Sequence, residues 1–166
     1  MAKISFKSSE RFFSQLQELE RTFAKDETLE KAVHAGAAVV ADKIRDNLEA
    51  LPEEPFRHLQ PGEVFHGIPK GQKKDLVDSF GLTPIDRDRT GFVHTKAGFD
   101  GYGSYPTETH PQGVPNQLVA AATESGSSVR AKMPFVRPAV NATRKKAIEA
   151  MEKVIDAEIQ DVFEGE

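Results

Sequence analysis

The stretch Pro134-Phe135-Val136-Arg137-Pro138-Ala139-Val140 decides where the middle of the chain ends and its last helix begins. The first proline fixes its own φ and biases the preceding residue toward extended backbone. The second proline suits the first turn of a helix, and Phe135 supplies a large apolar side chain just before it. The stretch therefore predicts a strand-to-helix corner. We expect the guanidinium of Arg137 to donate to backbone carbonyls or to a carboxylate such as Glu124.

A long helix is predicted after this corner, over residues 138–162. Its apolar residues recur at helical spacing: Ala147, Ile148, Met151, Val154, Ile155, Ile159 and Val162. Its charges form an early basic group and a late acidic group, which include Arg144, Lys145, Lys146, Glu152 and Asp156. This order opposes the helix macrodipole, at a cost of at most about 1 kcal/mol per charge. Two interpretations stay open: a solvated face, or pairing of these groups between neighbouring copies of the chain.

Two more helices are predicted near the start of the chain. Phe12, Leu16, Leu19 and Phe23 form the apolar stripe of a helix that starts near Ser8 or Ser9. A second helix follows residue 26 and extends to about residue 51. Its first half is rich in small residues, which we attribute to helix propensity, with close approach of another element as the alternative.

The middle of the chain predicts a small antiparallel sheet. Residues 73–80 have the pattern of a helical turn, and residues 82–86 and 90–99 that of a hairpin with one solvent-exposed face. Residues 118–124 fit either a strand or a short helix, and residues 129–133 predict one more strand. Together these elements indicate a single α+β domain over residues 1–166, with the sheet packed against two N-terminal helices and the long C-terminal helix.

Two long loops interrupt this body. The windows 52–72 and 98–116 hold seven Gly or Pro residues each, out of 12 Gly and 10 Pro in the whole chain. Loops of this length are uncommon inside compact domains and usually serve a function. We expect them to act as arms that contact neighbouring subunits.

Composition excludes several classes of protein. The chain has no cysteine, which excludes disulfides, thiol nucleophiles and cysteine-ligated metal sites. Charges interrupt the apolar residues at the start of the chain, and no stretch approaches the roughly 18 apolar residues of a membrane span. We therefore expect a soluble protein of a reducing cytoplasm, with no signal peptide and no membrane partner. A net charge of −4 argues against an obligate duplex-DNA binder.

No arrangement of residues predicts catalysis, a cofactor or a metal. His58 and His66 lie in the first loop near Glu53, Glu54 and Glu63, but their spacing matches no metal-ligand motif. The phosphate-binding and nucleophile motifs of common enzyme folds are also missing from the sequence. We therefore predict a protein that is not an enzyme.

A nucleic-acid-binding regulatory module is the alternative function. A basic run in and after the first loop is interleaved with aromatic residues, as in a platform that stacks single-stranded bases. These residues are Arg57, Lys70, Lys73 and Lys74, with Phe56, Phe65 and Phe80. The negative net charge and the lack of a recognition-helix motif weigh against it.

The segment Leu118–Ser127, the corner and the long helix together resemble the tail-component family of siphophages and prophages. The resemblance rests on a Glu-x-Gly-Thr/Ser turn followed by a Pro-Phe-x-Arg-Pro-Ala box. The matching residues here are Glu124, Gly126, Pro134, Phe135, Arg137 and Pro138. Members of the family are described as tail-completion, head–tail joining or minor tail proteins.

The resemblance implies a structural virion assembly protein that completes the tail or joins it to the head at the neck. It implies a homo-oligomeric ring, such as a hexamer, as the assembled form. The implied partners are a head connector or head-closure protein and a tail-tube or tail-terminator protein, with DNA only as cargo through the ring. The implied location is the host bacterial cytoplasm during assembly and then the virion neck or tail.

Overall fold

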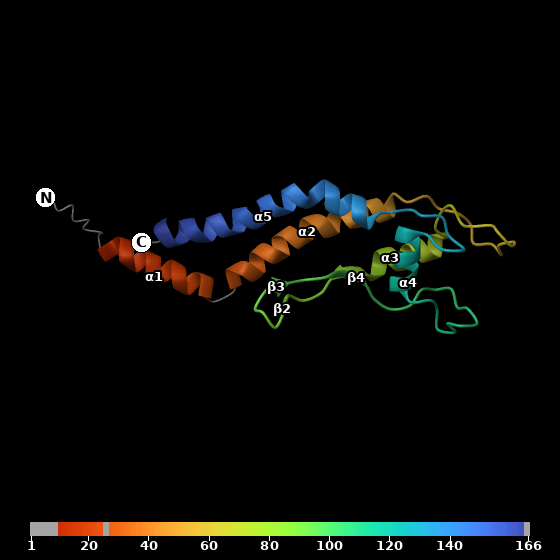
Figure 1. Ribbon diagram of the computed structural model, residues 1–166, viewed down its shortest axis with the longest axis horizontal. Coiled ribbons are helices and arrows are strands. Elements are labelled where there is room, and N and C mark those ends of the chain that lie inside the picture. Colours follow the sequence, from red (N-terminus) through yellow and green to blue (C-terminus); the bar gives the residue numbers. More distant parts are fainter. Residues whose placement is uncertain (1–9, 25–26, 165–166) are drawn as a thin grey trace.

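The computed structural model describes residues 10–24 and 27–164, which form an elongated molecule with a helical end and a loop end (Figure 1). The elements in chain order are α1 (Glu10–Ala24), α2 (Glu27–Glu49), α3 (Lys70–Ser79), β1 (Phe80–Leu82), β2 (Asp86–Arg87), β3 (Val93–His94), β4 (Ala97–Phe99), α4 (Asn116–Ser125) and α5 (Val136–Glu164). Helices with short antiparallel strands confirm the predicted α+β class. The predicted helix start near Ser8 or Ser9 lies outside the described residues.

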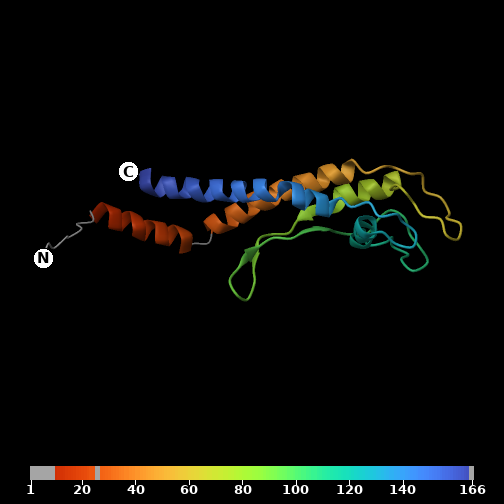
Figure 2. The same cartoon turned by 45° about the horizontal axis from the view of Figure 1, so that its top comes forward.

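Helices α2 and α5 pack side by side in antiparallel directions along the length of the molecule (Figures 1 and 2). The small residues of α2 make this close approach possible, because a Cβ atom added at Gly36 would lie 2.7 Å from Cγ of Met151 and 3.1 Å from the carbonyl oxygen of Ala147. The alternative interpretation, close approach of another element, therefore holds at Gly36. Lys31 Nζ of α2 also lies 3.3 Å from Glu158 Oε1 of α5.

The hydrophobic core lies where α2, α3, α4 and the start of α5 meet. Its largest fully buried apolar side chains are Phe135, Leu48, Ile68 and Leu76. Phe99 of β4 extends this core toward the hairpin, since its ring contacts that of Phe135 at a centroid distance of 6.1 Å. The predicted corner therefore packs through its phenylalanine, as expected.

The strands form one hairpin that projects from the body (Figure 2). Strand β1 pairs with β4 and β2 pairs with β3, so the predicted hairpin is confirmed but its ladder is interrupted. Thr83 lies at the interruption, where its carbonyl oxygen accepts a 2.7 Å hydrogen bond from the Thr95 hydroxyl. Asp86 and Arg87 belong to β2, and the polar connection at the tip begins at Asp88.

The structure decides one choice that the sequence left open and changes three local predictions. Residues 118–124 are helical, within α4. Residues 129–133 form no strand, because their only ladder contacts are isolated bridges, such as the parallel bridge from Arg130 to Phe65. Helix α3 begins at Lys70, three residues earlier than predicted, and α5 begins at Val136 before the second proline of the corner. Pro138 occupies the first turn of α5, as expected.

The long loops lie together at one end of the molecule (Figure 1). The first connects α2 to α3, and its two arms are joined by an isolated bridge between Glu53 and Ile68. The second connects β4 to α4. None of the described helices combines the length and apolar character needed to cross a membrane.

Candidate functional site

The corner before α5 is built around the carboxylate of Glu124, which lies in the last turn of α4. Its Oε2 atom accepts hydrogen bonds from the backbone N–H groups of Phe135 at 2.7 Å and Val136 at 2.8 Å. Its Oε1 atom accepts one from the backbone N–H of Arg137 at 3.0 Å. These N–H groups lie at the start of α5 and have no partner within the helix, so Glu124 caps α5 from the preceding helix.

Two opposing effects set the acidity of this carboxylate. Partial burial by itself would raise the pKa of Glu124. The three backbone N–H donors and the nearby charge of Arg137 together outweigh burial and hold that pKa below its ordinary value. Glu124 is therefore ionised at neutral pH, as a cap on a helix N-terminus requires.

The residues of the Pro-Phe-x-Arg-Pro box divide into buried and exposed positions. Phe135 is fully buried, whereas Pro134, Arg137 and Pro138 are exposed. Arg137 meets Glu124 through its backbone N–H, and no side-chain hydrogen bond to Glu124 is found among the described residues. The prediction that the guanidinium donates to carbonyls or to a carboxylate such as Glu124 was therefore wrong for the described residues. Arg137 and Glu124 are in contact, but the donor is the backbone N–H of Arg137.

Gly126 reverses the chain after α4. Its φ of 82° lies in a region that L side chains rarely adopt, and its N–H donates to the carbonyl of Ala122 at 2.9 Å. The turn brings Met133 back onto α4, where its N–H donates to the carbonyl of Thr123 at 2.8 Å. The Glu-x-Gly turn and the box thus form one hydrogen-bonded unit.

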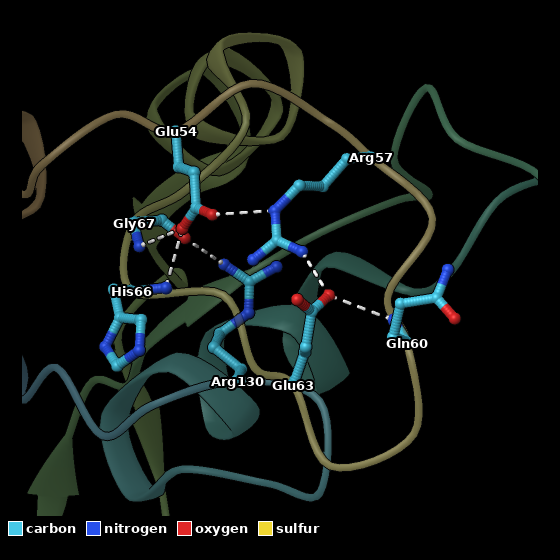
Figure 3. A network of polar contacts seen from close by, with 7 residues as sticks. All are labelled: Glu54, Arg57, Gln60, Glu63, His66, Gly67 and Arg130. Carbon is cyan, nitrogen blue, oxygen red and sulfur yellow. Dashed lines mark hydrogen bonds and ion pairs between the residues drawn. The ribbon is translucent and has the colours of Figure 1, made fainter.

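A network of charged side chains holds the first loop (Figure 3). The Glu54 carboxylate accepts backbone hydrogen bonds from His66 at 2.6 Å and Gly67 at 3.0 Å, and it also accepts one from Arg57 Nε at 3.2 Å. Arg57 reaches Glu63 Oε2 at 2.6 Å. The hydrogen bond from His66 is the largest contribution that lowers the pKa of Glu54, and the one to Glu63 raises the pKa of Arg57.

Arg130 ties this loop to the segment before α5. Its side chain donates to the carbonyl of Gly67 at 3.3 Å and to Gln72 Oε1 at 2.6 Å, and the residue is only 7% exposed. Its guanidinium also lies over the ring of Phe65, 5.8 Å from the centroid. Burial lowers the pKa of Arg130, and Glu54 opposes this effect. A guanidinium remains charged even so.

In the sequence, Arg130 is only the first residue of a second basic run, which extends to Lys146. The signal that could have singled it out is its position directly after the polar turn 125–128, within the predicted extended segment 129–133. Its role depends on residues of the first loop about 60 positions earlier in the sequence, which only the folded chain brings close to it.

Aromatic rings join the two long loops to each other. The ring of Phe56 in the first loop stacks on that of Tyr105 in the second, with centroids 5.0 Å apart and planes 18° apart. Phe56 also stacks on Phe65 at 6.1 Å. Tyr105 in turn packs against Gly71 in α3, where an added Cβ would lie 2.7 Å from the tyrosine hydroxyl. The loops therefore form one wall instead of two independent arms.

An open apolar groove of about 440 Å³ lies between this wall and α4. We call it the loop groove. Its residues are Phe56, Arg57, His58, Leu59, Phe65, Gln72, Thr107, Val114, Leu118, Val119, Ala122, Val129 and Arg130. Phe56, Leu118 and Val129 are each more than half exposed, so large apolar side chains of the groove face solvent. Exposed apolar surface of this kind is typical of an interaction site.

The predicted contact residues on α5 lie along one exposed helix. Arg144, Lys145, Lys146, Glu152 and Asp156 are all exposed. Lys145 lies 3.7 Å from Glu149 in the next turn, so one of the basic side chains has an acidic partner in its own chain. The two charge groups occupy different parts of α5.

The residues that motivated a nucleic-acid module are mostly engaged within the chain. Phe65 and Phe80 are buried, which leaves Phe56 as the exposed ring of the three. Arg57 contacts two carboxylates, and Lys73 donates to the carbonyl of Leu51 at 2.9 Å. Lys70 and Lys74 are exposed.

The histidines of the first loop do not converge on a metal site. His66 contributes its backbone N–H to Glu54, and the ring of His58 meets that of Phe56 edge-on, with centroids 6.5 Å apart. In the parts of the chain that the structure describes, no three His, Asp or Glu side chains are grouped to hold a metal ion.

Comparison with known proteins finds no matching family model, no matching curated protein and no matching solved structure. Function is therefore inferred from the residues and the geometry of this chain.

Proposed function

We propose that this chain is a structural virion assembly protein of a tailed phage or prophage. In this proposal it completes the tail or joins it to the head at the neck, as a ring of identical subunits. The observation that carries the proposal is the loop groove, an open apolar surface walled by both long loops. A second support is that the residues that resemble the tail-component family meet in one hydrogen-bonded corner, around Glu124.

The elongated shape suits a subunit that spans two layers of an assembly. The groove is lined by residues of the long loops and α4 at one end of the molecule, and α5 extends from the body to the opposite, helical end (Figure 1). We assign the outer partners to a head connector or head-closure protein and to a tail-tube or tail-terminator protein. A net charge of −4 suits a ring that passes DNA without binding it tightly. The protein would act in the host cytoplasm and end in the virion neck or tail.

The test is disruption of the gene in the phage or prophage that encodes the chain, followed by electron microscopy of the lysate. We expect separate DNA-filled heads and tails, and joined particles again when the protein is supplied from a plasmid. Joined, infectious particles in the disrupted strain would contradict the proposal. Specific DNA binding by the purified protein, weakened steeply by salt, would favour the nucleic-acid module instead.

The charged groups of α5 give a second test of the ring. If Arg144, Lys146, Glu152 and Asp156 pair between copies, the native mass measured at low salt should fall toward that of a monomer as salt is raised. A monomer at every salt and protein concentration would count against assembly through this helix.

A further inference from the structure

The turn of the hairpin carries an exposed aromatic side chain on a rigid support. Phe92 lies between β2 and β3 and is 73% exposed, more than any other large apolar side chain in the described residues. Asp88 Oδ1 accepts hydrogen bonds from the backbone N–H groups of Thr90 at 2.8 Å and Phe92 at 3.0 Å. Since the backbone is already held in this way, burial of the ring would cost little ordering entropy.

The loop groove has the chemistry of a site for an aromatic ring. The exposed Arg57 lines it, with its guanidinium 5.6 Å from the centroid of the mostly buried ring of Phe65. Phe56 adds an exposed ring at one side, and Leu118 an exposed aliphatic side chain at another. Aromatic rings and guanidinium groups both attract the face or edge of a further ring. A groove of about 440 Å³ also has room for a phenylalanine side chain.

The exposed ring and the groove cannot meet within one chain. The hairpin turn projects midway along the molecule, whereas the groove lies by α4 and the long loops at one end, and both views show this separation (Figures 1 and 2). A contact between two different patches of identical chains is heterologous, and it closes into a ring when the rotation allows. The chain thus carries both halves of the kind of contact that a ring requires.

We propose that the Phe92 turn of one copy inserts into the loop groove of a second copy. This inference rests on the proposed function, because it specifies the subunit contact of the proposed ring. One phenylalanine buries at most about 250 Å², and a stable interface needs about 1,000 Å² or more. Phe92 is therefore the anchor of a wider contact, to which the charged face of α5 adds.

The first experiment compares the self-association of three purified proteins by native mass and sedimentation over a range of concentrations. Phe92→Ala removes the anchor, and Tyr102→Ala is the matched control because it removes an aromatic side chain that is 60% exposed and does not line the groove. We expect Phe92→Ala to weaken association at least about 30-fold, as for an anchor residue, and the control to change it little. Equal effects of the two substitutions would overturn the inference. Circular dichroism checks that both variants stay folded.

The second experiment uses the absence of cysteine from the chain. Arg89→Cys, at an exposed position of the same turn that leaves Phe92 in place, and Leu118→Cys are made as separate proteins. They are mixed in equal amounts and oxidised, so any disulfide joins two introduced residues. We expect the mixed pair to form in preference to either like pair, because a disulfide needs Cα atoms about 4.4–6.8 Å apart. An oligomer that yields no mixed pair, or a chain that stays monomeric at all concentrations, would overturn the inference. Failure of this contact leaves the gene-disruption test of the proposed function unaffected. A wrong subunit contact can therefore be distinguished from a wrong function.

Discussion

Replacement of Glu124 by alanine should destabilise the whole fold, because one carboxylate holds the start of α5 against the end of α4. A capping side chain replaced by alanine costs about 0.5–2 kcal/mol, and hydrogen bonds to a charged group contribute more than neutral ones. Here a single carboxylate accepts three backbone N–H groups at 2.7, 2.8 and 3.0 Å. The corner is partly exposed, so water replaces some of these bonds. We therefore expect Glu124→Ala to lower the free energy of unfolding by about 2–3 kcal/mol.

This loss should depend on pH in a defined direction. The pKa of Glu124 is lower in the folded protein than its ordinary value, so the folded state favours the ionised form. The stabilisation is fully present above the pKa of the unfolded chain and is lost as pH falls through the lowered folded pKa. The difference between wild type and Glu124→Ala should thus be constant from pH 7 to about pH 5 and shrink below about pH 4.

The assay is urea denaturation followed by circular dichroism at several pH values. Glu20→Ala is the matched control, because Glu20 is an exposed glutamate of α1 with no described contact and no part in the proposed subunit contact. Glu124→Gln should fall between wild type and Glu124→Ala, since it keeps one acceptor oxygen without the charge. A loss for Glu124→Ala no larger than that of the control, or one that grows as pH falls below 4, would refute the capping role.

Three further substitutions test other contacts, each by urea or thermal unfolding. Gly36→Leu should lower the free energy of unfolding by about 1–3 kcal/mol, because a side chain there overlaps Met151 of α5. Its control, His34→Leu on the exposed face of α2, should change that free energy little. Arg130→Ala should lower the free energy of unfolding by about 2–4 kcal/mol, because the first loop loses two hydrogen bonds from a buried guanidinium. It should also speed tryptic cleavage at Arg57. Arg137→Ala, at an exposed position, is its control. Gly126→Ala should lower the free energy of unfolding by about 1–3 kcal/mol, because Gly126 has a φ of 82° and an added Cβ would contact Lys132. Gly81→Ala, at a position with open space around it, should be tolerated.

Each of these expectations has an outcome that contradicts it. Full stability of Gly36→Leu would mean that α2 and α5 do not approach closely at this point. Unchanged cleavage in Arg130→Ala would mean that the first loop is held by other contacts. Equal stability of the two glycine variants would mean that the turn after α4 is not constrained.

Much of the helical framework could be predicted from the sequence, because helices depend on local spacing. The apolar period of α5 and the two prolines of the corner are local signals, and they predicted the start of the helix and the apolar role of Phe135. The strand expected before the corner is absent, because residues 129–133 make only isolated bridges. The hairpin was also predicted, since alternation over residues 90–99 is a local pattern as well. The choice between strand and helix for residues 118–124 could not be made, because a short apolar run fits both.

The candidate site also has a part that could be predicted from the sequence and a part that could not. Glu124 and Arg137 were paired from the sequence, but only the fold shows that the donor is the backbone, because the start of α5 presents its free N–H groups there. Arg130 and the loop groove depend on contacts between residues about 60 positions apart, which no local pattern records.

By itself, the sequence determined the class of fold, the positions of the long loops and the exclusion of cysteine chemistry, because these follow from composition and local periodicity. Only the tertiary structure decided that the small residues of α2 admit α5 and that the two loops stack into one wall. It also decided that Phe92 and the loop groove lie apart on the surface. These properties depend on which distant surfaces meet, and packing of the whole chain sets that.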